Sequence, residues 1–208
     1  MSDIIQGSPE WMAARLGRVT ASKIADVMAK GRSGAPSATR ANYVAQLVAG
    51  RLSGRAADGF TNAAMQWGTE TEPQARACYT MATGNAVAEV GFVPHPSIDM
   101  TGASPDGLIG DDGLIEIKCP NTATHIETLM GGAIADKYLK QMLFQMACTG
   151  RAWCDFVSFD PRMPDEMQLS IQRVHRDGAA IVEIETAVRE LLAEVDHTCA
   201  VLRDKFGG

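Results

Sequence analysis

Two short motifs in the middle of the chain hold the side chains best suited to chemistry, Pro105-Asp106 and Glu116-Ile117-Lys118. Side chains alternate along a strand, so Glu116 and Lys118 would point to one face and Ile117 to the other. Two carboxylates held close together repel each other unless a cation lies between them. Carboxylate oxygens are hard ligands that suit Mg²⁺ or Mn²⁺. A lysine beside such a metal, its pKa lowered by the cation and by burial, could orient or deprotonate a water molecule. The motifs therefore predict metal-assisted hydrolysis of a phosphodiester.

A β-hairpin would bring the two motifs together. Asp111-Asp112-Gly113 is typical of a hairpin turn, and residues 114–119 are predicted to form a strand that Pro120 ends. This strand would fold back beside the segment that leaves Asp106, so that the charged side chains converge on one spot. The alternative is an exposed hairpin with ordinary surface charges, because Glu-x-Lys pairs are common on strands.

The elements around this hairpin predict an α+β fold. Helices are predicted over residues 8–17, 20–29, 39–52, 125–130, 137–149 and 179–206, with a helical stretch over 61–81 that Gly68 and Pro73 interrupt. Strands are predicted over 87–93, 114–119, 152–159 and 167–174. This order indicates a central mixed β-sheet flanked by helices. The length predicts a single domain over 1–208, with N-terminal helices (1–82), a sheet core (87–175) and a C-terminal helix (179–206).

Composition excludes several classes of protein. The chain has 208 residues, of which 46% are hydrophobic and 21% charged, an ordinary globular mixture rather than a disordered one. Its apolar runs are far shorter than the roughly 20 residues of a membrane span, and its first residues lack the pattern of a signal peptide. The five cysteines include no Cys-x-x-Cys pair, which fits a reducing compartment. We therefore expect a cytoplasmic protein with no membrane partner.

The formal net charge of −6 is unevenly distributed along the chain. Residues 1–60 hold eight Lys or Arg against four Asp or Glu, whereas residues 61–120 hold two against eight. An acidic protein can bind DNA when its basic groups face a cleft or channel. We therefore expect the N-terminal part to meet phosphate and the acidic middle part to contain the metal site.

The ordered motifs resemble a known family. Asp106 with Glu116-Ile117-Lys118 is similar to the signature of the PD-(D/E)XK nucleases, and the wider pattern resembles the phage lambda exonuclease, or YqaJ-like, family of viral recombination nucleases. Each block is weak alone, but they follow the family's order over roughly residues 8–165. The blocks are Trp11–Gly17 with Thr20-Ala21-Ser22, Trp67–Glu72, Ser104–Gly107, Glu116–Pro120, Tyr138–Gln141 with Gln145-Met146, and Phe159–Arg162. The resemblance implies a PD-(D/E)XK, restriction-endonuclease-like core and a single nuclease domain.

The resemblance also implies the members of an active site. Its metal ligands would be Asp106, Glu116, Glu72 and the main-chain carbonyl of Ile117. They would hold two Mg²⁺ ions per site, for which Mn²⁺ could substitute. Lys118 matches the catalytic lysine. Gln141 matches a glutamine that lies near the scissile phosphate or the lysine.

Four further residues are candidates for contact with DNA. Arg15 matches an arginine that grips phosphate, although a surface salt bridge is the alternative. Ser22 lies where a helix N-terminus could bind an anion, or it caps the helix. Arg32, in a Gly-rich loop, would contact the DNA backbone or simply be solvated. Met65 is either a wedge that separates the terminal base pair or a core residue.

The activity that the resemblance implies is 5′→3′ digestion of linear double-stranded DNA. It would release 5′-mononucleotides and leave 3′ single-stranded tails for phage recombination in the bacterial host. A ring-shaped homotrimer and a phage single-strand annealing protein as partner are implied as well. The alternatives are an endonuclease of restriction or repair type and a catalytically inactive DNA-binding module. The Arg15 and Trp67–Glu72 blocks favour the exonuclease, and the intact Asp106, Glu116 and Lys118 favour an enzyme.

Overall fold

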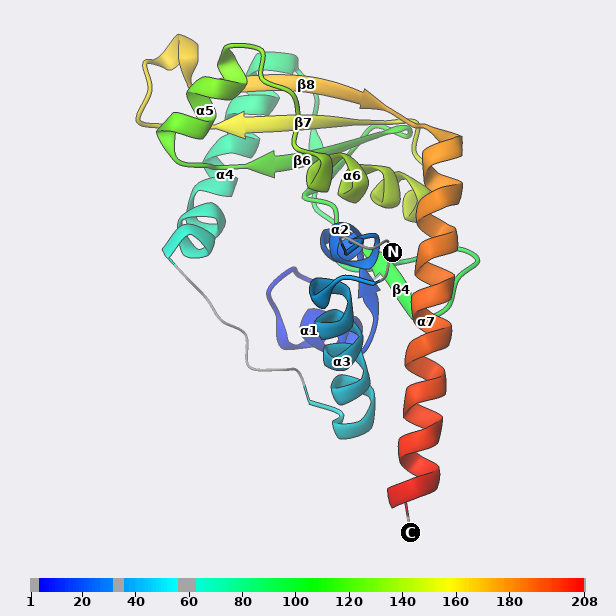
Figure 1. The fold of residues 1–208 in the computed structure, drawn as a ribbon. Coiled ribbons are helices and arrows are strands. Elements are labelled where there is room, and N and C mark those ends of the chain that lie inside the picture. The colour runs from blue at the N-terminus through cyan, green and yellow to red at the C-terminus, as the bar shows by residue number, and fades with distance from the viewer. Residues whose placement is uncertain (1–3, 32–35, 56–62, 208) are drawn as a thin grey trace.

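A five-stranded mixed sheet forms one end of the molecule (Figure 1). The computed structural model describes residues 4–31, 36–55 and 63–207. Strands in the sheet run in the order β2 (Val87–Ala88), β5 (Gly107–Ile109), β6 (Gly113–Lys118), β7 (Trp153–Phe159) and β8 (Leu169–His175). Strands β6 and β7 are parallel, and the other neighbouring pairs are antiparallel. The predicted α+β fold with a mixed sheet is therefore confirmed.

Helices cover both faces of this sheet. Ile115 and Ile117 of β6 pack with Tyr79 on one face, against α4 (Ala63–Thr83), which passes behind the strands in Figure 1. Leu114 of β6 packs with Met142 on the opposite face, against α6 (Asp136–Thr149). Because side chains alternate along β6, Glu116 and Lys118 share the face of Leu114 and point toward α6. Helix α5 (Thr122–Leu129) follows β6 and contacts β7.

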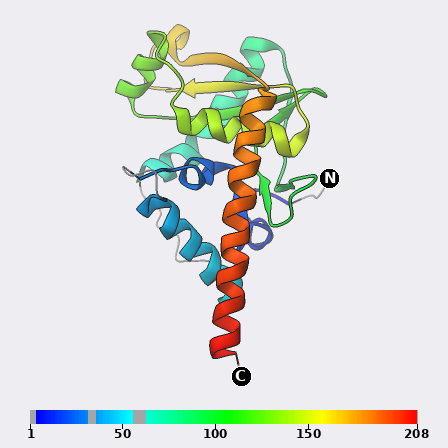
Figure 2. The same cartoon turned by 45° about the vertical axis from the view of Figure 1, so that its right-hand side comes forward.

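The N-terminal helices form a second core with the long helix α7 (Gly178–Phe206). The elements of this part are α1 (Pro9–Arg15), η1 (Ala21–Lys23), α2 (Ile24–Val27), α3 (Ala38–Ser53) and a small sheet of β1 (Val19–Thr20), β4 (Thr101–Ala103) and β3 (Val93–Pro94). Figure 2 shows α7 running from the five-stranded sheet to the far end of the molecule. Among the described residues, none of the helices combines the length and hydropathy needed to span a bilayer.

Three predicted elements differ from the structure. Helix α4 is continuous, although a break at Gly68 or Pro73 was expected. A proline inside a helix costs about 3 kcal/mol, and α4 offsets this cost by burying Thr71, Ala75 and Tyr79 on one face.

The other two differences concern segments that are shorter than expected. The helix expected over 20–29 is a three-residue 3₁₀ turn followed by the four residues of α2. The strand expected over 87–93 is divided into β2 and β3, which belong to different sheets. Between them Gly91 passes so close to Ile4 that an added Cβ would lie 2.4 Å from the Ile4 carbonyl oxygen.

Candidate active site

The predicted hairpin exists and joins the two motifs. Gly107 of β5 pairs with Ile115 of β6, which places Asp106 next to the segment that carries Glu116. The Oδ2 atom of Asp106 accepts a hydrogen bond of 2.7 Å from the main-chain N–H of Ile117. The convergence expected from the turn and from strand alternation is therefore found.

Glu116 is fully buried (0% exposed) and accepts hydrogen bonds from three side chains. Lys118 Nζ donates to its Oε1 atom, which also accepts a 2.7 Å bond from Gln141 Nε2. Gln145 Nε2 donates to Oε2 at 2.6 Å. Gln145 was quoted in a family block but given no role. Its place one helical turn after Gln141 was the signal that both amides face the same target.

Glu72 reaches the site from α4, next to an arginine that the sequence analysis missed. Arg76 Nη2 lies 2.6 Å from Glu72 Oε1 and 3.4 Å from the main-chain oxygen of Asp106. Its Nη1 atom forms a 2.9 Å ion pair with Glu89. Arg76 therefore links α4 to the start of β5, and the signal for it was the Glu-to-Arg spacing of four residues.

The charges of the site perturb one another. Burial raises the pKa of Asp106 well above its usual range, repulsion from Glu116 adds to this rise, and Lys118 opposes it. Burial also raises the pKa of Glu72, against the opposing effect of Arg76. Burial alone would lower the pKa of Lys118, but Glu116 and Asp106 outweigh it and raise that pKa. The expected lowering of the Lys118 pKa depends on a bound cation, whereas carboxylates are the nearest charges of Lys118 in this arrangement.

The donor set fits a hard divalent cation. Asp106, Glu116, Glu72 and the carbonyl of Ile117 offer only oxygen atoms, which Mg²⁺ prefers. The raised pKa values of Asp106 and Glu72 show that these carboxylates lack full compensation for their charge. No group of three or more His, Cys, Asp or Glu among the described residues is already arranged to hold a metal. Lys118 and Gln141 share Glu116 Oε1, so a cation there would have to displace them.

An open cleft of about 600 Å³ leads to these residues. Its walls come from α4, from the end of β6 and from the first turn of α6, which contributes Lys137 and Tyr138. Met65 lines this cleft and is 56% exposed, so the reading of Met65 as a core residue is wrong. Tyr138 also faces the lysine, because Lys118 Nζ lies 5.4 Å from the centre of its ring.

Arg15 lies against the serine that precedes Pro105-Asp106. Its Nη1 atom donates to Ser104 Oγ at 3.2 Å, Trp11 Nε1 donates to the same oxygen at 2.9 Å, and the guanidinium stacks on the Trp11 ring at 4.1 Å. Arg15 forms no ion pair with the residues that the structure describes, so these residues give no support to the salt-bridge alternative. Since Ser104 Oγ already accepts two bonds, its own O–H remains able to donate. The half-buried guanidinium of Arg15 beside a hydroxyl that can still donate therefore favours the binding of an anion.

Ser22 and Arg32 are the other candidates for contact with phosphate. Ser22 is exposed, and its hydroxyl lies 3.4 Å from Thr20 Oγ1 in the short η1 turn. The reading of Ser22 as a helix cap is wrong, because Ser22 lies inside η1, where Thr20 holds the N-cap position, and Lys23 holds that of α2. Arg32 lies outside the described residues.

An ion pair between buried Asp160 and half-exposed Arg162 braces the elements that carry the site. Asp160 accepts bonds of 2.7 and 3.0 Å from Arg162, and its pKa is lowered to about 2 because these and other hydrogen bonds outweigh burial, which would raise it. Arg162 also donates to the carbonyl of Pro120 at 3.2 Å and lies 4.8 Å from the centre of the Trp67 ring. It therefore connects the ends of β6 and β7 with α4.

Comparison with known proteins gives three similarities. The family model of the YqaJ-like viral recombinase domain matches residues 10–152. An alkaline exonuclease, LHK-Exo, from Laribacter hongkongensis is 56% identical, with a TM-score of 0.89 over 95% of this chain and 97% of its own. Its complex with dAMP matches equally well. A phage-related exonuclease from Haemophilus somnus 129PT shares the fold at 16% identity, with a TM-score of 0.68 over 89% of this chain and 96% of its own. No curated protein matches the sequence.

Proposed function

Since this chain belongs to the YqaJ-like viral recombinase family and is a nuclease, we propose that it is a Mg²⁺-dependent exonuclease that digests linear double-stranded DNA from its 5′ ends. The products are 5′-mononucleotides and 3′ single-stranded tails. The observation that carries the proposal is the convergence of Asp106, Glu116 and Lys118 at the end of an open cleft. The similar LHK-Exo is an exonuclease that binds dAMP, a 5′-mononucleotide, which supports the same product here.

Each residue of the site has a proposed role. Asp106, Glu116, the Ile117 carbonyl and Glu72 would hold two Mg²⁺ ions, or Mn²⁺ in their place. Bound Mg²⁺ supplies Lewis-acid stabilisation of the charge that develops during in-line displacement at phosphorus. Lys118 orients the attacking water as a hydrogen-bond donor, and Gln141 orients Glu116 through its 2.7 Å bond to Oε1.

The DNA end is proposed to be held near the segment that precedes Asp106, where Arg15 contacts Ser104. Arg15 binds the terminal phosphate with the hydroxyl of Ser104, because a guanidinium and a hydroxyl donor together match phosphate oxygens. Ser22 and Arg32 contribute further backbone contacts. Met65, exposed at the cleft wall, acts as the apolar wedge that helps to separate the terminal base pair.

Membership of the family supports a proposal about the biological setting. We propose a homotrimeric ring that encloses the DNA and a phage single-strand annealing protein that receives the 3′ tails. The site of action would be the cytoplasm of the bacterial host. Light scattering of the purified protein tests the ring, and a monomer with full processivity would contradict it.

One experiment tests activity, polarity and end recognition together. Linear duplexes labelled at the 5′ or the 3′ end, with and without a 5′-phosphate, are incubated with Mg²⁺ beside the same DNA as a closed circle. We expect early release of the 5′ label as a mononucleotide, an intact circle, and no digestion in EDTA. Cutting of the circle would instead establish an endonuclease. The absence of any cleavage by the folded protein would establish a binding module.

A further inference from the structure

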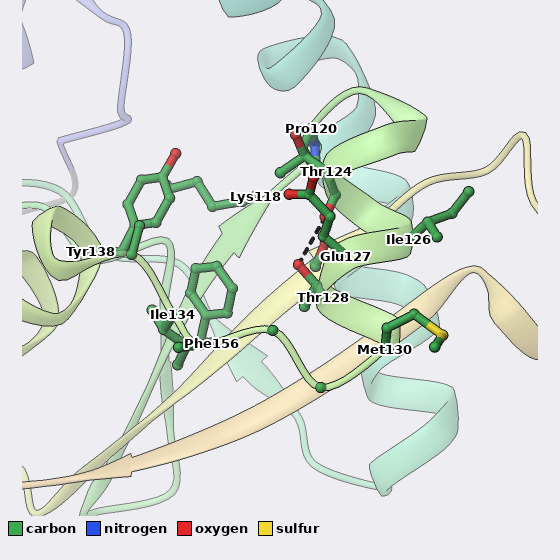
Figure 3. Close-up of a pocket in the computed structure, with 15 residues that line it drawn as sticks. Lys118, Pro120, Thr124, Ile126, Glu127, Thr128, Met130, Ile134, Tyr138 and Phe156 are labelled. Atoms are coloured by element: carbon green, nitrogen blue, oxygen red, sulfur yellow. Dashed lines mark hydrogen bonds between the residues drawn. The ribbon is translucent and has the colours of Figure 1, made fainter.

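A second cavity, of about 690 Å³, adjoins the catalytic cleft (Figure 3). It lies between α5, the segment 130–135 and the start of α6. Lys118, Pro120 and Tyr138 line both the cavity and the cleft, so the two spaces share a wall. Its volume falls within the range of about 300–1,000 Å³ that is typical of small-ligand sites. A strand held for cleavage therefore lies directly beside it.

The floor of this cavity is fixed by the register of the sheet. The parallel pairing of β6 and β7 places Phe156 beside Glu116 and Ser158 beside Lys118. Side chains of paired residues share a face, so Phe156 and Ser158 project toward α6 as the catalytic residues do. Both line the cavity. The geometry that sets the catalytic residues therefore also sets this floor.

The hydroxyl of Ser158, the polar group of this floor, is already hydrogen-bonded within the protein. Ser158 Oγ lies 2.8 Å from His125 Nδ1, and His125 Nε2 lies 2.8 Å from the carbonyl oxygen of Met167. A carbonyl accepts only, so Nε2 carries the proton and Nδ1 accepts from the serine hydroxyl. Thr128 likewise donates to the carbonyl of Thr124 at 3.1 Å, as the dashed line in Figure 3 shows. Ser158 and Thr128 are thus already hydrogen-bonded, and the charged side chains of the lining are Lys118, at the wall shared with the cleft, and Glu127 of α5.

The walls are instead aromatic and apolar. Tyr138 and Phe156 form a tilted pair with ring centroids 5.6 Å apart, and Figure 3 shows Ile134 beside Phe156. Segment 131–133 adds only glycine and alanine, which leave room for a flat group. A planar, mainly apolar ring attached to a phosphate chain fits such a space, and a nucleobase has this chemistry.

We propose that this cavity receives a nucleobase of the strand held in the catalytic cleft, stacked against Tyr138. The inference rests on the proposed function, since it assumes a nucleic-acid strand at Lys118. A peptide of a partner protein is a less suitable occupant, because it would cover the lysine. Stacking of one base on an aromatic side chain contributes roughly 10- to 100-fold in affinity.

The test compares two inhibitors that differ only in the base. Deoxyadenosine 5′-monophosphate and 2-deoxyribose 5-phosphate are each added during digestion of a linear duplex. Direct calorimetric titration of both is carried out in parallel. Thr128→Trp fills the cavity from α5. Thr198→Trp on α7 is its matched control, because Thr198 is similarly half-buried and donates to the carbonyl four residues earlier at 2.8 Å.

For the unchanged protein we expect the nucleotide to bind at least about 10-fold more tightly than the sugar phosphate. In Thr128→Trp the nucleotide and the sugar phosphate should bind within about 2-fold of each other, because only the affinity for the nucleotide falls. Thr198→Trp should bind both compounds with the affinities of the unchanged protein. The proposal would be overturned if folded Thr128→Trp still bound the nucleotide more tightly than the sugar phosphate. It would also be overturned if the unchanged protein digested DNA but bound the two compounds equally well. If Thr128→Trp does not fold, Ala133→Leu replaces it with the same expectation. Titration separates the two proposals, because a protein that binds the nucleotide preferentially yet digests no DNA would contradict only the proposed function.

Discussion

Replacing Gln145 by leucine should weaken metal binding at Glu116 without unfolding the protein. Gln145 is fully buried, and its Nε2 atom donates to Glu116 Oε2 at 2.6 Å. A hydrogen bond to a charged group is worth about 1.5–3 kcal/mol. This bond fixes the orientation of a proposed metal ligand, so its loss should raise the Mg²⁺ concentration needed for half-maximal rate by roughly 10- to 100-fold.

The stability of the same variant should change little, for a reason specific to this side chain. The Oε1 atom of Gln145 is buried and has no hydrogen-bond partner among the described residues. An unpartnered buried polar atom costs about 1–3 kcal/mol, and leucine removes it. This gain offsets the lost hydrogen bond, so the free energy of unfolding should stay within about 1 kcal/mol of the original.

Two measurements decide the outcome. Initial rates of digestion as a function of Mg²⁺ give the metal dependence, and urea unfolding in EDTA gives the stability. Gln172→Leu is the control, because Gln172 Nε2 makes only a 3.4 Å bond to a main-chain carbonyl, and its metal dependence should be unchanged. An unaltered Mg²⁺ dependence in Gln145→Leu, or a loss of more than about 3 kcal/mol of stability, would refute the reasoning.

Three further predictions concern other parts of the molecule. Asp160→Asn should lower the free energy of unfolding by about 2 kcal/mol near pH 7. The folded-state pKa of Asp160 lies below its usual value, so this difference should be full above about pH 4 and fade as the pH falls toward 2; a constant difference in pH-dependent urea unfolding would contradict it. Gly113→Ala should cost about 1–3 kcal/mol in the same assay, because an added Cβ would lie 2.2 Å from the Trp153 ring, and unchanged stability would show that the ring moves freely. Arg15→Ala should reduce digestion of 5′-phosphorylated ends by at least about 10-fold and affect unphosphorylated ends less; equal losses on both substrates would remove its role in phosphate binding.

The sequence predicts those contacts of the site that are made by residues close together in the chain. Asp106 and Glu116 come together because a short turn and the alternation of strand residues suffice to place them. The same local reasoning correctly predicts α1, where the side chain of Ser8 accepts from the N–H of Trp11. Periodicity correctly predicts the position of α7 within one residue at its start.

The parts that were missed depend on tertiary packing. Gln145 acts on Glu116 only because α6 lies across that face of the sheet, which no local pattern specifies. The continuity of α4 through Pro73 likewise depends on the buried face of the helix. Tertiary burial outweighs helix propensity in such cases.

The excess of basic residues over 1–60 only partly predicts which side chains are available to contact DNA. Arg40 forms a 2.6 Å ion pair with Glu194 of α7, and Arg51 pairs with Asp196 of the same helix. Both arginines belong to the basic N-terminal part, but they hold α3 against α7 rather than adding to a surface for phosphate. Arg15 differs from them because it has no acidic partner among the described residues, and geometry rather than net charge distinguishes it.

The distances in sequence between the parts of the site bear on when the enzyme becomes active. Asp106 and Ile117 lie 11 residues apart in a hairpin, whereas the contacts of Glu116 with Gln141 and Gln145 join β6 to α6 across 25 and 29 residues. Such non-local contacts form late in folding. A nascent chain that ends before α6 has the acidic residues but not the amides that orient Glu116. We therefore expect no hydrolysis of DNA from a nascent chain until α6 has been synthesised and has packed on the sheet.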